Sequence, residues 1–313
     1  MEILNAVFGW TANVAHRMAA GDGLVITAGS FIAMVLVERL IYIFSPEAPK
    51  YDNRDFFSNA KSQIFSAFAD GLVGSALFVG AYLLVYENFR IFNIEYNAMT
   101  LFLVFVLNDF RYYVDHFLAH RVGALWSLHF AHHSSHEMTL IVANRNTALS
   151  FAKLMEPGHM VLALIGVPLP MLLVVTFFGN LWGIFNHTRL IKRMGFLDLI
   201  LCTPSVHRVH HGIEPKYLDK NYGQVLLVWD HMFRTYQREE EEPTYGLVDR
   251  SEYHSILDIQ TGGVQWLWKR LKRSPKWSDK LKYLLMPPGW SHDGQHEMTT
   301  DLQRKGPSSS EGI

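Results

Sequence analysis

Residues 157–188, PGHMVLALIGVPLPMLLVVTFFGNLWGIFNHT, contain no Asp, Glu, Lys or Arg. The run is 32 residues long, and a helix needs about 20 residues to cross a bilayer. Pro168 and Pro170 interrupt it, and proline breaks or kinks a helix because it lacks an N–H and clashes with the preceding turn. The stretch therefore predicts a helical hairpin, with residues 148–167 running one way and 171–186 returning.

Three earlier stretches are apolar over nearly the length of a membrane span: Gly23–Phe44, Phe65–Tyr86 and Ala98–Val114. The first contains Glu38 and Arg39, charges that lipid tolerates only if they pair or face the interior of a helix bundle. We therefore predict an all-α integral membrane protein with about four to five membrane-crossing helices. The alternative is a soluble helical protein with unusually apolar core helices.

The basic residues predict an orientation for these spans. Residues 45–64 contain three basic side chains and residues 87–97 contain one, and basic loops favour the cytosolic side of a membrane. Counting crossings from there puts the end of the third span, both ends of the hairpin and everything after residue 186 in the cytosol. Because we find no ending that signals retention in the endoplasmic reticulum, we expect a bacterial inner membrane.

The composition limits the kinds of partner and site. The chain has 28 basic and 29 acidic residues, whereas binding to a polyanion such as nucleic acid needs a basic surplus. We therefore expect no nucleic-acid partner. A single cysteine, Cys202, accompanies 16 histidines, so one thiolate cannot build a zinc or iron–sulfur site by itself. A metal in this protein would be held by histidine.

Histidines gather in two parts of the chain. Six of the 16 fall between His116 and His136, where even scattering would put about one. Three groups have the spacing i, i+4 or i, i+3, i+4, which places imidazoles on one face of a helix. They are His116 and His120; His129, His132 and His133; and His207, His210 and His211.

These eight imidazoles, with His187 as a ninth, exceed the needs of one metal ion. Zinc takes about four ligands and an octahedral ion about six, so the set predicts two metals. Imidazole binds iron, zinc, copper and nickel alike, and the spacing does not choose among them. The zinc-protease motif H-E-x-x-H does not occur in the sequence.

At these residues the chain resembles the sterol desaturase/fatty acid hydroxylase family of integral-membrane di-iron oxygenases. The family's boxes, H-x-x-x-H, H-x-x-H-H and H-x-x-H-H, match the three histidine groups above. Flanking segments are similar too, especially to the alkylglycerol monooxygenase-like bacterial branch. The similar segments are Asp109–His116, Thr203–Gly212, Asp219–Gly223 and Trp229-Asp230, within a resemblance that covers about residues 98–248.

The resemblance implies a cytosolic helical cap in which the nine histidines hold two iron ions, with no catalytic residue beyond these ligands. It implies hydroxylation of a C–H bond of an acyl, alkyl-ether or sterol-like lipid by O2. The two electrons would come from a separate donor of the cytochrome b5, ferredoxin or pterin type. A desaturase with the same metals remains an alternative, as does a histidine-rich membrane protein that binds or transports metal.

Four further side chains are candidates for orienting the imidazoles, since metal-bound histidine usually donates its second N–H to an acceptor. Asp109, Asp115 and Asp230 are the nearest carboxylates to the boxes, with helix capping or surface exposure as the alternative. His136 stands where relatives often have an acidic or amide residue, which leaves its role open. Arg234 stands where that branch commonly has glycine, so the local turn is expected to differ.

These features divide the chain into four parts. We expect N-terminal membrane helices in 1–97, the catalytic domain in 98–248, a cytosolic or interfacial segment in 249–293 and a disordered tail in 294–313. Within the third part, residues 264–283 combine tryptophans with many basic residues. That combination suits a helix at an anionic membrane surface, or an amphipathic helix packed on the domain.

Overall fold

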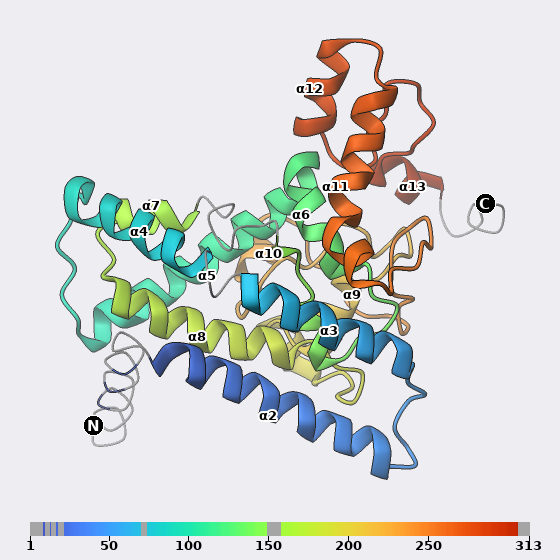
Figure 1. The fold of residues 1–313 in the computed structure, drawn as a ribbon. Helices are drawn as coiled ribbons and strands as arrows, with labels where there is room; N and C mark the ends of the chain where they lie inside the picture. Colours follow the sequence, from blue (N-terminus) through green and yellow to red (C-terminus); the bar gives the residue numbers. More distant parts are fainter. Residues whose placement is uncertain are drawn as a thin grey trace.

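The computed structural model describes residues 22–69, 74–148 and 158–305, together with positions 9, 13 and 17. Within those residues the chain is helical and forms no strand, only two isolated bridges, Leu201 with Leu226 and Gly212 with Tyr245. The predicted all-α class is confirmed. The α-helices, shown in Figure 1, are α2 (Gly23–Phe44), α3 (Asn53–Ala69), α4 (Ser75–Phe89), α5 (Ala98–Arg121), α6 (Gly123–His133), α7 (Gly158–Ile165), α8 (Leu169–Phe185), α9 (Pro204–His210), α10 (Val228–Met232), α11 (Ile256–Arg273), α12 (Trp277–Leu285) and α13 (Thr299–Lys305), with short 3₁₀ helices at Leu140–Asn144 and Gly195–Leu199.

Helix α8 lies at the centre of the apolar bundle and packs against α5 and α2 (Figure 1). Pro168 caps its N-terminus and Pro170 lies in its first turn, where a missing N–H leaves no hydrogen bond unmade. The turn of the predicted hairpin is therefore confirmed. The preceding arm is less complete than predicted, because α7 covers only Gly158–Ile165 and residues 149–157 lie outside the described part.

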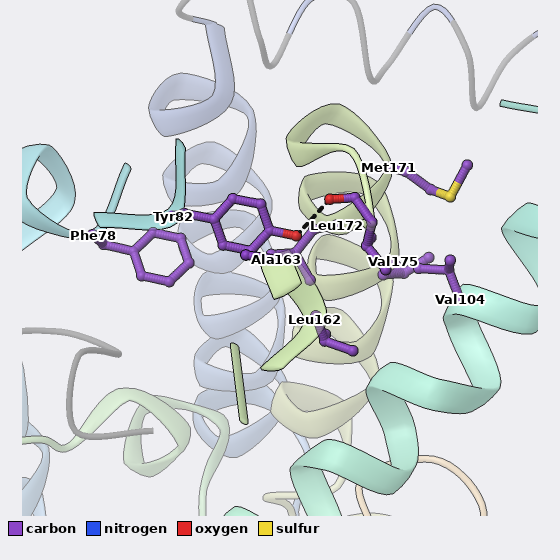
Figure 2. Close-up of a cluster of buried hydrophobic side chains, with 9 residues drawn as sticks. Phe78, Tyr82, Val104, Leu162, Ala163, Met171, Leu172 and Val175 are labelled. Atoms are coloured by element: carbon purple, nitrogen blue, oxygen red, sulfur yellow. Dashed lines mark hydrogen bonds between the residues drawn. The ribbon is translucent and has the colours of Figure 1, made fainter. Parts of the chain in front are cut away.

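A core of apolar side chains joins α4, α5, α7 and α8. Figure 2 shows Phe78 and Tyr82 of α4 facing the side chains of the α7–α8 hairpin. The hydroxyl of Tyr82, a fully buried residue, donates to the carbonyl of Val167 at 2.7 Å (Figure 2). That bond satisfies one of the carbonyls that the break between α7 and α8 leaves unpaired.

Helix α3 is amphipathic in the opposite sense to a helix of a soluble protein. Its buried side chains are polar, whereas Phe57, Ile64 and Phe68 are 55 to 73% exposed. The buried face is satisfied by hydrogen bonds, for example from Gln260 Nε2 to the hydroxyls of Ser62 and Ser66, both at 2.8 Å. An apolar outer face on a polar inner face fits contact with lipid.

The predicted second span, Phe65–Tyr86, includes residues 70–73, which lie outside the described part of the chain. It covers the end of α3 and most of α4, which stop and start at Ala69 and Ser75. The hydropathy pattern missed α3 because the buried serines, Asn59 and Asp55 lower its average apolarity. Tertiary hydrogen bonds, which the sequence pattern does not report, stabilise that polar face.

In the described residues, one helix is long and apolar enough to cross a membrane, at Val25–Phe44, and two shorter apolar helices occupy Ala76–Phe89 and Leu169–Phe185. The number of crossings thus stays a prediction. The two charged side chains inside the first span have hydrogen-bond partners. Glu38 accepts from the backbone N–H of Leu140 at 2.8 Å and from the Thr188 hydroxyl at 2.7 Å, and Arg39 donates to Asn53.

The C-terminal part of the chain is helical over much of its described length. Residues 264–283 belong to two helices, α11 and α12, and α11 packs closely against α6. The segment 294–313 was expected to be disordered, yet it contains α13. Gln303 of this helix donates to the carbonyl of Leu218 at 3.1 Å. A contact with a distant loop therefore orders a sequence whose composition is typical of a tail, while residues 306–313 lie outside the described part.

Candidate metal centre

The three histidine boxes lie on three helices, as the spacing predicts. His116 and His120 lie in the last turns of α5, a helix started by a capping box between Asn97 and Thr100. The second box occupies the end of α6 and the third occupies α9, where Pro204 begins the helix and His211 ends it. Each box thus lies near a helix C-terminus, and His187 follows the end of α8.

The structure brings all nine predicted ligand residues together in two groups. Within each group one nitrogen from every histidine lies within 4.8 Å of the others. The five-histidine cluster contains His116, His120, His129, His133 and His210, and the four-histidine cluster contains His132, His187, His207 and His211. The clusters adjoin, since the rings of His133 and His211 stack with their centroids 4.5 Å apart.

Helix geometry explains how each H-x-x-H-H box serves both clusters. Residues four apart lie on nearly the same side of a helix, whereas adjacent residues point about 100° apart. His129 and His133 therefore enter the five-histidine cluster together, and His132 turns into the other. The third box mirrors this arrangement, with His207 and His211 in the four-histidine cluster and His210 in the first.

Several outer ring nitrogens are fixed by backbone carbonyls. Nδ1 of His116 lies 2.9 Å from the Tyr222 carbonyl, Nδ1 of His210 2.9 Å from that of Lys220, and Nδ1 of His187 2.7 Å from that of Gly183. A carbonyl only accepts, so each Nδ1 must carry the proton. In the neutral ring the remaining nitrogen, Nε2, then carries a free lone pair that is directed into its cluster.

One short loop, Asp219–Gly223, provides most of this support for the five-histidine cluster. In addition to the two carbonyls, Asp219 Oδ1 lies 3.7 Å from Nδ1 of His120. Asp219 and Asn221 have φ of 59° and 56°, in the left-handed region that Asp and Asn adopt more readily than most residues. Because two residues of the loop have this left-handed conformation, the carbonyls of Lys220 and Tyr222 both reach imidazole rings of the cluster. Asn221 holds the loop through bonds to the carbonyls of Val206 and Gln237.

Burial keeps the imidazoles in the form that binds metal. Burial, with a smaller electrostatic effect of the neighbouring His120, lowers the pKa of His116 to about 3, and burial lowers the pKa of His187 to about 4. Burial and neighbouring histidines likewise hold the pKa well below its ordinary value for His129, His132, His133, His207, His210 and His211. Neutral imidazole is the metal-binding state.

The unpartnered nitrogens show that the residues fit a metal pair. Nε2 of His116, His120, His129 and His211 is buried and makes no hydrogen bond in the described structure. Other Nε2 atoms face each other, at 3.1 Å for His133 and His210 and at 3.0 Å for His187 and His207. Leaving so many buried polar atoms unsatisfied costs free energy, and a cation shared among the lone pairs would remove that cost.

The three carboxylates that were predicted to orient the imidazoles bind other groups instead. The carboxylate of Asp109 accepts hydrogen bonds from the backbone N–H groups of residues 225 and 226 and from the ring N–H of Trp229. The carboxylate of Asp230 accepts from the backbone N–H groups of Tyr222 and Gly223 and from the hydroxyl of Thr235. Each therefore fixes a loop rather than an imidazole, although Asp230 holds the loop that supports His116. Asp115 pairs with Arg111 at 3.0 Å.

His136 lies outside both clusters. Its Nε2 lies 3.3 Å from the Ser251 carbonyl, and its ring fills the space beside Gly246. Arg234, expected to change the local turn, instead has φ of 61°, so it keeps the left-handed conformation that glycine prefers.

Sequence reasoning missed the residues that hold the site from outside. Asp219 was within a segment noted as similar to the family, but backbone carbonyls leave no sequence signal. Arg208, next to His207, was also missed. It is 2% exposed, binds Glu239 through two bonds of 2.7 and 2.8 Å, and donates to the carbonyls of Thr188 and Ile191.

A helical scaffold with two adjoining clusters of imidazoles is the arrangement of a histidine-rich metalloprotein. Residues 101–235 match the family model described as fatty acid hydroxylase, so this part of the chain is a fatty acid hydroxylase domain and the predicted family is confirmed. The family is iron-dependent. The matched range contains every residue of both clusters.

Similar curated proteins include alkylglycerol monooxygenases. That of Danio rerio is 32% identical over 263 residues, 83% of this chain and 58% of the relative, and that of Caenorhabditis elegans is 34% identical over 69% and 45%. The ornithine lipid hydroxylase OlsE of Rhizobium tropici is 33% identical over 44% and 42%. The chain thus spans about half the length of the curated relatives it matches. No solved structure matches it significantly.

Proposed function

We propose that this chain is a membrane-bound, di-iron lipid hydroxylase. The observation that carries the proposal is the pair of adjoining clusters, with five and four imidazoles, inside a fatty acid hydroxylase domain. Nine donors suit two ions that each keep at least one position free, since an octahedral ion takes about six ligands. The similar lipid hydroxylases support a lipid substrate, with the metal site at the cytosolic rim of the membrane helices.

The reaction would insert one atom of O2 into a C–H bond, while the second atom leaves as water with two protons and two electrons from a separate donor protein. Bound irons would supply the oxygen reduction and the C–H oxidation. The protein's own contribution is to hold the site. Burial keeps the imidazoles neutral, and the Asp219–Gly223 loop fixes their orientation so that little reorganisation is needed when metal binds.

The exposed apolar surface supports a substrate from the bilayer. Large apolar side chains on α2 to α5 face outward, among them Ile32, Leu36 and Val37 of α2, each more than half exposed. A soluble protein rarely leaves such a continuous apolar surface uncovered. The metal clusters lie where α5 leaves the predicted span Ala98–Val114, so a lipid within the membrane would have a short route to them.

Comparative lipid mass spectrometry of cells with and without the gene tests the proposal. A lipid that gains one oxygen atom only in the presence of the gene is the expected product. A product lacking two hydrogen atoms would instead identify a desaturase. Unchanged lipids in aerated, iron-replete cells, with metal still bound to the protein, would favour metal binding or transport.

Variants connect that activity to the clusters. We expect His132→Ala, in the four-histidine cluster, and His210→Ala, in the other, to abolish product formation while the protein still inserts into membranes. His296→Ala changes an exposed histidine outside both clusters and is the matched control. Product formation by either cluster variant, purified and free of wild-type protein, would contradict the assignment.

A further inference from the structure

Helix α12 has one apolar face that nothing covers in the described structure. Trp277, Leu281 and Leu285 are spaced i, i+4, i+8 and are 84%, 56% and 58% exposed. Residues at this spacing form a stripe along one side of a helix. We name these three side chains the α12 stripe. Figure 1 shows α12 beside α11, and both project away from α2 and α8.

The opposite side of α12 is fixed to the metal-binding domain. Tyr283 is buried, its ring packs on Trp290 with centroids 4.9 Å apart, and the backbone N–H of Gly123 donates to the Met286 carbonyl at 3.0 Å. A Cβ at Gly123 would collide with the carbonyl of Tyr283. With this side anchored so closely, α12 cannot rotate to bury its stripe against the protein.

The surroundings of the stripe are strongly basic. Residues 264–283 contain seven Lys and Arg and a single acidic residue, Asp279. Lysine heads accompany the exposed tryptophans, with Lys280 Nζ 4.8 Å from the Trp277 ring centroid and Lys272 Nζ 5.2 Å from that of Trp268. Exposed tryptophan flanked by lysine is the composition of helices that lie at the boundary of an anionic bilayer.

The anchor also sets the height of α12 relative to the membrane. Gly123 lies nine residues after Val114, the predicted end of the third span. At about 1.5 Å of rise per helical residue that is roughly 13 Å. The headgroup layer on each side of the hydrocarbon is roughly 5–8 Å thick. Apolar side chains that extend from α12 toward the bilayer therefore reach the headgroup layer.

We propose that the α12 stripe inserts into the surface of the same bilayer that holds the helical bundle, and that the adjacent lysines and arginines bind anionic lipid headgroups. The proposal rests on the proposed membrane topology. It makes α11 and α12 a lateral support for α6, the helix that carries the second histidine box, because α12 and α11 both pack on α6.

Nitroxide spin labels on the full-length protein in lipid vesicles test this. A label at Leu281→Cys reports on the stripe, and one at Leu285→Cys repeats the measurement. Asp279→Cys, partly exposed and about 160° around the same helix from Leu281, is the matched control. The native Cys202 is buried, and burial raises the pKa of its thiol, so it will not compete for the label. Collision rates are measured with O2, which concentrates in lipid, and with a water-soluble nickel chelate.

In vesicles containing phosphatidylglycerol we expect the ratio of O2 to nickel collisions to be severalfold higher at 281 and 285 than at 279. The double change Lys276→Gln with Lys280→Gln should lower the ratio at 281, and so should vesicles of phosphatidylcholine alone. Equal insertion into both lipids would overturn the role of the basic residues.

Nickel access at 281 equal to that at 279 would overturn the proposal. A label at 281 shielded from both probes would also overturn it, because it would indicate a protein partner or a second copy of the chain. A label at Leu36→Cys on α2 separates these failures from a wrong topology, since it should contact lipid whenever the bundle spans the membrane.

Discussion

At the scale of single residues, the carboxylate of Asp219 faces His120 of the five-histidine cluster from outside. Burial alone would raise its pKa, but the contact with His120 and the charge of Arg121 outweigh burial and lower it. An anionic partner makes the imidazole a stronger donor toward a metal. No equivalent carboxylate contact is recorded for the four-histidine cluster in the described residues.

Replacing this carboxylate should weaken metal binding without unfolding the protein. We expect Asp219→Asn to lower the affinity for iron by about 10–100-fold, the usual effect of removing an outer partner of a metal-bound histidine. Competition with a chelator measures it. Glu240→Gln, which removes an exposed partner of Lys216, is the control and should leave the affinity unchanged. Wild-type affinity in Asp219→Asn would show that the carboxylate has no such role.

Arg234 gives a second residue-scale prediction. Its left-handed backbone costs about 1–2 kcal/mol for a side chain with a Cβ, and its side chain is exposed. Arg234→Gly should raise the free energy of unfolding by about 0.5–1 kcal/mol, since glycine loses part of the gain through its freer unfolded chain. Arg238→Gly, at an exposed position with ordinary φ, should instead destabilise the protein. Thermal unfolding in detergent compares them, and a lower midpoint for Arg234→Gly would contradict the argument.

At the scale of helices, the clusters depend on how α9 and α6 are held. Arg208 joins α9 to the segment after His187. It therefore fixes the positions of two segments that carry histidines of the four-histidine cluster. Gly263 of α11 allows the closest approach to α6, because a Cβ there would collide with the carbonyl of Ser127 and lie 2.8 Å from Phe130 Cβ.

Breaking the buried Arg208–Glu239 pair should be costly. Glu239→Gln leaves the guanidinium buried without its counter-charge, for which we expect a loss of about 3–5 kcal/mol in the free energy of unfolding. Lys216→Gln removes an exposed pair and should cost less than about 1 kcal/mol. Denaturant unfolding of both variants provides the measurement. Similar losses of unfolding free energy in the two variants would contradict a larger contribution from the buried pair.

Close packing of α11 on α6 gives a parallel prediction. Gly263→Ala should destabilise the protein by about 1–3 kcal/mol because the methyl group forces the helices apart. At Gly80 of α4 an added Cβ meets nothing within 4 Å, so Gly80→Ala should be neutral or stabilising. The unfolding midpoints of the two alanine variants test this prediction. An unchanged midpoint for Gly263→Ala would show that α11 can shift without a loss of stability.

At the scale of the whole molecule, concentrating nine histidines in one buried site makes stability depend on pH and metal. Unfolded histidines bind protons as the pH falls through about 6.5, whereas folded His187 and His116 resist protonation until about pH 4 and pH 3. The unfolded state therefore binds more protons in that window, and stability falls as the pH falls.

We expect the metal-free protein to lose stability progressively below pH 6.5, each such histidine contributing up to about 1.4 kcal/mol per pH unit. Removing metal with a chelator should also lower the midpoint at pH 7.5, because metal binds only the folded site. Unfolding curves at several pH values test both effects. His187→Gln should reduce the slope, whereas the exposed His231→Gln should not. Stability independent of pH between 7.5 and 5 would contradict the buried neutral state.

The sequence by itself determined the helical class, the hairpin turn at Pro168 and Pro170, and the nine histidines that the fold gathers into two clusters. These features are local, since proline geometry and the i, i+3, i+4 spacing act within a single helix. For the same reason a period of 3.6 residues indicates which imidazoles share a face even when the partner helix is unknown.

Only the tertiary structure decided which histidines share a cluster, that a loop of carbonyls and Asp219 supports one of them, and that α3 turns its polar face inward. It also ordered α13 in a segment whose composition predicted disorder. All of these depend on contacts between residues far apart in the chain. A backbone carbonyl has no side-chain signature, and a buried serine looks the same in sequence as an exposed one until its partner, here Gln260, is in place.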